Sequence, residues 1–189
     1  MLEEISLEKA KQIYKEHIKK DFASNEIKPY WLYKKLLKEK TDKFYIYKEE
    51  TIEKGYIICS SEKEYVLITH LAVFKEYRGS GIGTKMIQAL KNQFLKDKAW
   101  IVEVETEKQA HNEEDMINIK RRIHFYEKLG FCKYPEIKYD LFGSSYYIFA
   151  LYPDNQNILE AKEVADILRK IYNHKRVPEK YLKISLEKQ

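Results

Sequence analysis

The spacing of apolar side chains changes along the chain, and each change predicts a different kind of element. In the first forty residues apolar positions recur every three or four residues, which indicates two helices. The first is expected to run from a cap at Ser6 to about Lys20, and the second to begin at Pro29, which suits the first turn of a helix. Leu2–Ile5 is compatible with a short strand ahead of them.

The middle of the chain has patterns typical of strands. Lys43–Lys48 and Gly55–Ser60 flank a charged turn, as in a hairpin, and Tyr65–Phe74 is almost entirely apolar, as in the buried centre of a sheet. A segment with apolar residues at helical spacing follows, and Ala99–Thr106 then has the composition of another strand.

The last third predicts two helices separated by a second hairpin. A helix near Asn118–Leu129 should end at Gly130. The hairpin pairs Ile137–Phe142 with Tyr146–Leu151 across Gly143-Ser144-Ser145.

The final segment predicts an amphipathic helix that Asn157 caps, followed by a basic, peripheral tail from His174. At 189 residues the chain has the length of one domain with a short appendage. We therefore expect one domain over residues 1–153, with the helix and basic tail of residues 154–189 packed on it or extending from it.

Composition narrows the class of protein. Hydrophobic residues make up 44% and charged residues 34% of the chain, and no apolar run approaches the ~18–20 residues of a membrane span. The start, Met1-Leu2-Glu3-Glu4, lacks the basic and then apolar stretch of a signal peptide. The two cysteines, Cys59 and Cys132, have no C-x-x-C partner and are interpreted as small apolar packing residues. A cytoplasmic location is expected, without a membrane partner, a disulfide or a metal.

The segment Arg78-Gly79-Ser80-Gly81-Ile82-Gly83-Thr84 lies between a predicted strand and a predicted helix. Three glycines in five residues let the backbone adopt positive φ and approach a ligand, and the free N–H groups of the first helical turn then converge. The helix dipole adds about half a positive charge, and Arg78 adds a full charge with donors that suit phosphate. This pattern predicts a pyrophosphate site, and the alternative is a glycine-rich structural turn.

Two better-known phosphate loops do not fit this spacing. A Walker loop needs a Gly-Lys pair, and a Rossmann loop needs a third glycine where Thr84 stands. What fits is Arg-x-x-Gly-x-Gly, filled by Arg78, Gly81 and Gly83. With Leu71-Ala72-Val73 ending the preceding strand, this segment resembles the coenzyme A pyrophosphate loop of the GNAT superfamily of N-acetyltransferases.

A second segment strengthens this resemblance. His124-Phe125-Tyr126-Glu127-Lys128-Leu129-Gly130-Phe131 is similar to the other signature of the family and follows the glycine loop at the right distance. The resemblance spans about Lys43–Tyr152 and is of a bacterial type. It implies an α/β (α+β) fold, with a mixed, mostly antiparallel central sheet of about six to seven strands flanked by helices and a C-terminal helical extension.

The resemblance also implies acetyl-CoA as cosubstrate, with acetyl passing to a primary amine by direct attack in a ternary complex. The backbone N–H of Val73 would hold the tetrahedral oxyanion, where the strand splays from its neighbour to admit the pantetheine arm. No metal is implied. The residues implied in binding the cosubstrate are Leu71, Ala72, Val73, Arg78, Gly79, Ser80, Gly81, Ile82, Gly83 and Thr84.

Tyr126 is the candidate general acid. By resemblance its hydroxyl would protonate the departing coenzyme thiolate, and a phenol with a pKa of about 10 suits that task. The alternative is plain packing, since Ile119 and Ile123 share its stripe of the helix. Ile119 also stands where many members of the family have an Asn that contacts the pantetheine, which is a departure from the pattern.

The incoming amine must lose a proton, and Glu103 and Glu105 are the candidate bases. They lie two apart on a predicted strand and so share one face of the sheet. Val102-Glu103-Val104 resembles the context of the base glutamate in some family members, which makes Glu103 the first choice. The alternative is that both carboxylates are solvated or paired with Arg121 or Arg122.

Charge gives a weaker indication of the partner. Acidic residues continue from this strand into the next loop, which favours a cationic amine as acceptor, either a small molecule or a peptide. The net charge of +5 is too small to indicate nucleic acid, and a monomer or a homodimer is expected. The alternative function is a non-catalytic acyl-CoA-binding or protein-interaction module of the same shape, against which the intact Tyr126 argues.

Overall fold

The computed structural model describes residues 1–22, 27–94, 98–153 and 157–187. The chain divides into two compact units. The first contains Met1–Ser61 and Ile68–Asp97, and the second contains Glu62–Leu67 and Lys98–Gln189.

The first unit begins with a helical segment that Ser6 caps, as predicted, by accepting from the backbone N–H of Lys9 at 3.3 Å. The segment is not one continuous α-helix. Helix α1 (Leu7–Ile13) passes into a π-helical turn, η1 (Tyr14–Ile18), and then into the short α2 (Lys19–Asp21). The predicted extent to about Lys20 is confirmed, since the helical segment ends at Asp21. The π-helical turn within it was not predicted, because a single π turn has no periodicity of its own in the sequence.

Two further helices belong to this unit. Helix α3 (Tyr30–Lys38) follows Pro29, which is its N-cap residue. The sequence predicted that this helix begins at Pro29, one position before its observed start. Helix α4 (Ile82–Phe94) follows the glycine loop.

The strands of the first unit pair in the order β1, β2, β3 and β4. Their bounds are β1 (Leu2–Glu4), β2 (Asp42–Glu49), β3 (Ile52–Glu62) and β4 (Tyr65–Val73), of which the last begins in the second unit. The β2–β3 hairpin has a turn of only two residues, since Glu49 lies opposite Ile52. The charged turn is shorter than predicted because its polar residues extend the strands, where Lys54 and Glu49 form an ion pair.

The core of the first unit lies between the sheet and the N-terminal helices. Alternate residues of β2 and β3, among them Phe44, Ile46 and Tyr56, point to the same face because side chains alternate along a strand. Ala10 and Ile13 of α1 belong to the same buried cluster.

The second unit contains β5, β8, β7 and β9 as neighbours in that order, with β6 paired to β8. Strand β8 pairs antiparallel with β5, β6 and β7, and β9 pairs antiparallel with β7. The elements are β5 (Ala99–Glu105), η3 (Glu107–Gln109), α5 (Glu113–Lys128), β6 (Cys132–Lys133), β7 (Ile137–Leu141), β8 (Ser144–Leu151), α6 (Ala161–His174), η4 (Glu179–Tyr181) and β9 (Leu182–Leu186).

Helix α5 starts earlier than predicted. The Asn112 side chain caps it by accepting from the backbone N–H of Asp115 at 2.8 Å, and three acidic residues in its first turn complement the helix dipole. Its end is as predicted, with Gly130 at a φ of +84°. The following hairpin has a two-residue turn of Phe142 and Gly143, both with positive φ, and not the three-residue connection expected.

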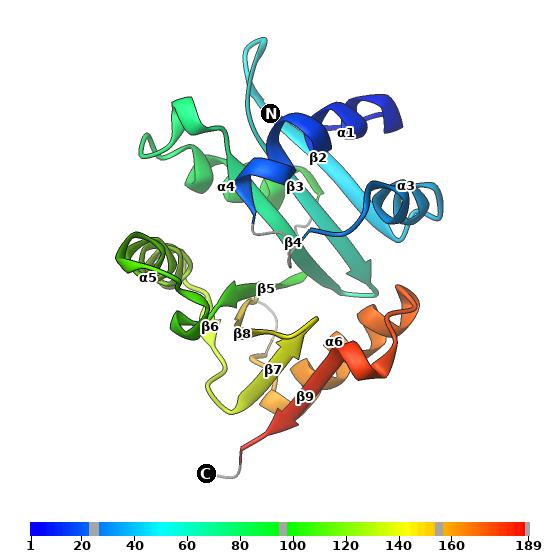
Figure 1. Cartoon of the computed structure of the whole chain (residues 1–189), viewed down its shortest axis with the longest axis vertical. Coiled ribbons are helices and arrows are strands. Elements are labelled where there is room, and N and C mark those ends of the chain that lie inside the picture. Colours follow the sequence, from blue (N-terminus) through cyan, green and yellow to red (C-terminus); the bar gives the residue numbers. More distant parts are fainter. Residues whose placement is uncertain (23–26, 95–97, 154–156, 188–189) are drawn as a thin grey trace. The chain divides into compact units, whose positions relative to one another are not determined.

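The C-terminal segment also differs from the prediction. Helix α6 is capped by Glu160, whose side chain and that of Glu163 form a reciprocal capping box, so Asn157 is not the cap. The tail after His174 is not peripheral, because β9 pairs antiparallel with β7 (Figure 1). Cys132 is exposed and is therefore not the packing residue that was expected, whereas Cys59 is buried.

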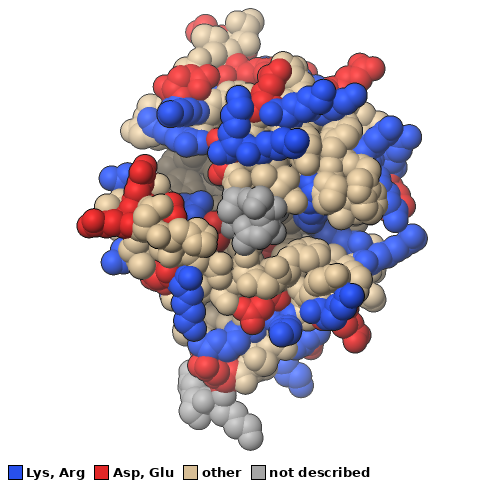
Figure 2. Space-filling model, viewed as in Figure 1, with Lys and Arg blue, Asp and Glu red and all other residues tan. Residues whose placement is uncertain are grey.

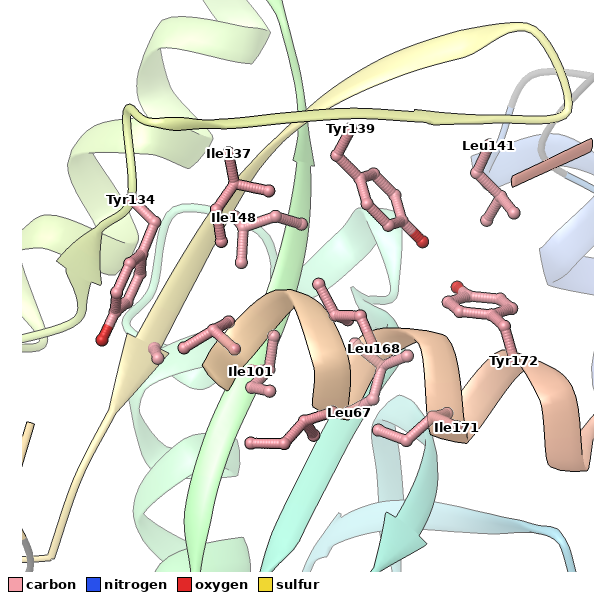
Figure 3. Close-up of a cluster of buried hydrophobic side chains, with 13 residues drawn as sticks. Leu67, Ile101, Tyr134, Ile137, Tyr139, Leu141, Ile148, Leu168, Ile171 and Tyr172 are labelled. Atoms are coloured by element: carbon pink, nitrogen blue, oxygen red, sulfur yellow. The ribbon is translucent and has the colours of Figure 1, made fainter. Parts of the chain in front are cut away.

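A cluster of buried apolar side chains forms the core of the second unit. Figure 3 shows that α6 contributes Leu168, Ile171 and Tyr172 to it, opposite Ile137 and Tyr139 of β7. The residues of 154–189 that the structure describes are thus packed into the second unit through α6 and β9.

The fold class is confirmed as mixed α/β, with mostly antiparallel strands and flanking helices. Nine strands occur among the described residues, more than the six to seven expected, because short or tail strands such as β6 and β9 add to the sheet. In the described part of the chain no helix is long and apolar enough to cross a membrane. Lys, Arg, Asp and Glu side chains are interspersed over the face shown in Figure 2.

Replacement of Gly55 by alanine tests the packing of the first unit. An ideal Cβ on this residue would lie 2.5 Å from the carbonyl oxygen of Ala72 and 2.7 Å from the sulfur of Met86. We expect Gly55→Ala to lower the free energy of unfolding by about 1–3 kcal/mol, the usual cost of overpacking. Urea unfolding measures this, and Ser61→Ala, at an exposed position of β3, should change it by less than about 0.5 kcal/mol. Equal midpoints for both variants would contradict the close contact.

Candidate functional site

The glycine loop joins β4 to α4 in the first unit, through a short turn over Lys75–Tyr77. Gly79 and Gly81 have φ angles of +77° and +79°, which glycine adopts without strain. The hydroxyl of Ser80 donates to the carbonyl oxygen of Tyr77 at 2.6 Å and ties down the loop. The positive φ predicted from the three glycines is therefore confirmed at two of them, and the third lies in α4.

The space beside the two left-handed glycines is open. An ideal Cβ on either Gly79 or Gly81 would meet no heavy atom of the described protein within 4 Å. A ligand can thus approach this backbone closely, as the binding of a diphosphate requires. Of the other residues implied in cosubstrate binding, Ala72 and Ile82 are buried, Leu71, Val73 and Gly83 are half-buried, and Arg78, Ser80 and Thr84 are exposed.

Arg78 is held by two oxygens. Its Nε donates to the carbonyl oxygen of Val73 at 3.0 Å, and one terminal nitrogen donates to the Asp21 carboxylate at 2.6 Å. Asp21 also accepts from the hydroxyl of Tyr56 at 3.2 Å. The guanidinium is thus fixed against the end of β4 while half of its side chain stays exposed. The sequence did not identify Asp21 as a partner of Arg78, because the two residues lie 57 positions apart.

Tyr126 lies in the second unit, on the buried face of α5. Its ring packs against Phe125, Phe131 and Phe149, with centroids 5.1, 5.2 and 6.4 Å away. Burial raises the pKa of Tyr126 to about 12, and the nearby Arg122 acts in the opposite direction. The phenol therefore keeps its proton at neutral pH.

Glu103 is bound by two tyrosine hydroxyls. Tyr172 donates to its two carboxylate oxygens at 2.7 and 2.9 Å, and Tyr139 donates to one of the same oxygens. Neither tyrosine was predicted as part of a site. For Tyr172 no short-range signal exists, since it lies 69 residues from Glu103.

Glu105 forms an ion pair with Arg122 of α5, which is one of the pairings that the sequence left open. The acidic residues of the following loop also have partners. Glu107 accepts from Tyr147 at 2.7 Å; burial opposes ionisation there, but this hydrogen bond and nearby lysines lower its pKa overall. Asp115 accepts from the backbone N–H of His111 at 3.1 Å. These acids are used within the unit, which weakens the expectation that they attract a cationic acceptor.

His70 is a buried packing residue of the first unit. Its ring is hydrogen-bonded with the Tyr33 hydroxyl at 3.1 Å and with Thr69 at 3.2 Å, and its edge meets Phe22. The structure thus places the glycine-loop residues together in one unit, and Tyr126, Glu103 and Glu105 in the other. Among the described residues, no group of three or more His, Cys, Asp or Glu side chains could hold a metal ion.

Comparison with known proteins identifies the protein family. Residues 40–133 match the family model described as an acetyltransferase (GNAT) domain, and by this match the chain belongs to the GNAT family. The matched region contains the glycine loop, Glu103, Glu105 and Tyr126, and it ends before Tyr139.

One sequence relative is N-alpha-acetyltransferase 30 of Schizosaccharomyces pombe, 32% identical over 108 residues. The alignment covers 53% of this chain and 65% of the relative, which is slightly less than two thirds of its length.

Solved structures share the fold. A GNAT-family protein from Bacteroides thetaiotaomicron has a TM-score of 0.71 at 19% identity and covers 90% of this chain and 94% of its own. Ard1 from Thermoplasma volcanium has a TM-score of 0.57 at 18% identity, with 81% and 97% covered. The ribosomal-protein-S18-alanine N-acetyltransferase of Escherichia coli has a TM-score of 0.56 at 17% identity, with 84% and 99% covered.

The left-handed backbone at Gly81 can be tested without a ligand. Because a Cβ has open space there, Gly81→Ala should cost only the backbone term of about 1–2 kcal/mol in free energy of unfolding. Gly81→Asn should cost less, since asparagine tolerates this conformation better. The urea unfolding midpoints of the two variants and of the parent protein show which substitution lowers the stability more. A larger loss for asparagine than for alanine would contradict the assigned conformation.

Proposed function

We propose that this chain is an acetyl-CoA-dependent N-acetyltransferase that moves acetyl to a primary amine by direct attack. The observation that carries the proposal is the glycine loop after β4, with two left-handed glycines, open space beside them and Arg78 at its edge. The family match over residues 40–133 supports it.

The loop would bind the diphosphate of the cosubstrate. Free N–H groups at the start of α4 and the positive end of its dipole favour an anion, and Arg78 adds a forked donor. The proposed contacts are Leu71, Ala72 and Val73 at the end of β4 and residues 78–84 of the loop. The cosubstrate supplies an acetyl thioester, whose carbon the amine attacks.

The chemistry needs a base, an oxyanion donor and a proton for the leaving group. Glu103, or Glu105 as second choice, takes a proton from the amine, whose nitrogen then forms a bond to the acetyl carbon. The backbone N–H of Val73 stabilises the oxyanion, and the carbon–sulfur bond breaks. Tyr126 donates to the departing sulfur. Glu103 is preferred because Glu105 is already paired with Arg122.

The acceptor is proposed to be a primary amine of a small molecule or a peptide. Two similar proteins guide the first choices: the relative from Schizosaccharomyces pombe is an N-alpha-acetyltransferase, and a structural neighbour from Vibrio cholerae is a spermidine N-acetyltransferase. Peptide α-amines, lysine side chains and polyamines therefore form the first panel.

The proposed function is tested by thiol release from acetyl-CoA with this panel of amines. We expect at least one class of amine to accelerate thiol release well above the slow hydrolysis seen without an acceptor, with the acetylated amine found by mass spectrometry. If the protein binds acetyl-CoA and no amine accelerates thiol release, it is a non-catalytic acyl-CoA-binding module. If it binds no acetyl-CoA at millimolar levels, the whole proposal is wrong.

Tyr126→Phe tests the proton donor. The variant keeps the ring contacts with Phe131 and Phe149 and loses only the hydroxyl. We expect kcat to fall by roughly 10²-fold or more, the usual range for a general acid, with the Kd of acetyl-CoA unchanged. Tyr181→Phe removes an exposed phenol and serves as the control. A kcat within about twofold of the parent would remove Tyr126 from the mechanism.

Asp21→Asn tests the role of Arg78. The Asp21 carboxylate is an anion 2.6 Å from the nitrogen that would bind phosphate, so it competes with the diphosphate. Because Arg78 is half-exposed, the pair is worth at most about 1 kcal/mol, and we expect acetyl-CoA to bind up to about fivefold more tightly to the variant. Calorimetry at low salt measures the Kd, with Glu39→Gln, at the residue that follows α3, as the control. Weaker binding by Asp21→Asn would show that Arg78 needs Asp21 to bind the ligand.

A further inference from the structure

A carboxylate and two phenols meet inside the second unit, from three elements far apart in the sequence. Glu103 lies on β5, Tyr139 on β7 and Tyr172 on α6. Tyr172 donates to both Glu103 oxygens at 2.7 and 2.9 Å, and Tyr139 donates to one of them. Figure 3 shows the hydroxyls of the two tyrosines turned toward each other.

The two phenols are fixed donors. Their side chains are buried, with exposed fractions of 2% for Tyr139 and 1% for Tyr172, in the cluster that also holds Leu168 and Ile171. Burial and the charge of Glu103 raise the pKa of both tyrosines well above the ordinary value. Both therefore remain protonated throughout the pH range of an enzyme assay. Hydrogen bonds from such donors to a carboxylate are charge-assisted and favour its ionised form.

A purely structural role explains this arrangement poorly. Glu103 is half-buried, so its carboxylate is partly removed from water at a cost in free energy that an apolar residue at this position of β5 would not have. Ile101, two residues earlier on the same face of β5, is such an apolar residue. The polar cluster has a use if the carboxylate must be ionised and held in one orientation.

We propose that Tyr172, with Tyr139 as its partner, is a positioning residue that holds the Glu103 carboxylate ionised and oriented to take a proton from the acceptor amine. This inference rests on the proposed N-acetyltransferase function. Both tyrosines lie outside the residues 40–133 that match the family model. The C-terminal helix α6 thus supplies a residue to the active site, in addition to its packing role.

Other polar groups near the cluster set the background for a pH measurement. The ring of Tyr146 on β8 lies 6.1 Å from that of Tyr139, and the ammonium of Lys175 lies 5.6 Å from the ring centroid of Tyr172. Glu105, on the same strand, is paired with Arg122. These groups are present in every variant below, so differences between variants report on the deleted hydroxyl.

Tyr172→Phe tests the proposal through the pH dependence of kcat/KM. Loss of one donor makes the ionised carboxylate less stable, so its proton is lost only at higher pH. We expect the acidic limb of the profile to move up by about one pH unit, with activity recovering at high pH and the KM of acetyl-CoA unchanged. Tyr139→Phe should move the limb in the same direction, and it replaces the first variant if that one does not fold.

Tyr134→Phe is the matched control. It removes another buried phenol of the same apolar cluster, whose hydroxyl bonds with Tyr152 and the carbonyl oxygen of Leu159 and not with Glu103. Loss of stability without a shift of the acidic limb is expected for it. If Tyr172→Phe behaves like this control, with uniformly lower activity and an unmoved limb, Tyr172 is only a packing residue and the proposal is wrong.

A second measurement does not depend on activity. The carboxyl carbon of Glu103, labelled with ¹³C and assigned by its loss in Glu103→Gln, can be titrated by NMR without any substrate. We expect its midpoint to lie at higher pH in Tyr172→Phe than in the parent. If no amine is acetylated but this shift occurs, the proposed function fails and the control of Glu103 by α6 stands. An unchanged midpoint overturns the positioning role even if the enzyme is active.

Discussion

The left-handed backbone at Gly79 and Gly81 turns the chain from β4 into α4, and what the first unit can bind depends on this turn. An L-residue with a side chain pays about 1–2 kcal/mol for that conformation, so glycine is needed there. The same absence of a Cβ leaves the space beside the backbone open. An anion that binds to this backbone needs that space to be open.

A second constraint is the placement of the acidic residues in the second unit. Glu103, Glu105 and Glu107 follow one another at every second position along β5 and the turn after it, and each has a different partner. Two phenols bind the first, an arginine of α5 binds the second, and a tyrosine of β8 binds the third. Three carboxylates close in the chain are thus given three different environments. Only the first is tied to the C-terminal helix, so α6 contributes a polar contact to β5 as well as apolar side chains to the core.

The sequence predicted best where a local pattern has one physical cause. Apolar runs marked β4 and β5, and the glycine spacing marked a loop of positive φ. Two errors had signals that were present in the sequence. Asn112 before three acidic residues is a cap pattern, and apolar residues alternate through Leu182–Leu186, which forms β9.

Other features could not be predicted from the sequence. The contacts of Arg78 with Asp21 and of Glu103 with Tyr172 join residues 57 and 69 positions apart. No periodicity links such positions, because they are brought together by the packing of helices on strands. The π-helical turn at Tyr14–Ile18 is another feature of this kind, since its residues have an ordinary amphipathic spacing.

The most direct measurement is amide hydrogen exchange of the whole protein with and without saturating acetyl-CoA. If the glycine loop binds the diphosphate, the amides of residues 79–84 must exchange more slowly in the complex, because their N–H groups then have acceptors. Binding that leaves the exchange of this segment unchanged and slows another part of the chain would contradict the assignment of the site. No binding at millimolar acetyl-CoA would contradict the assignment of the ligand.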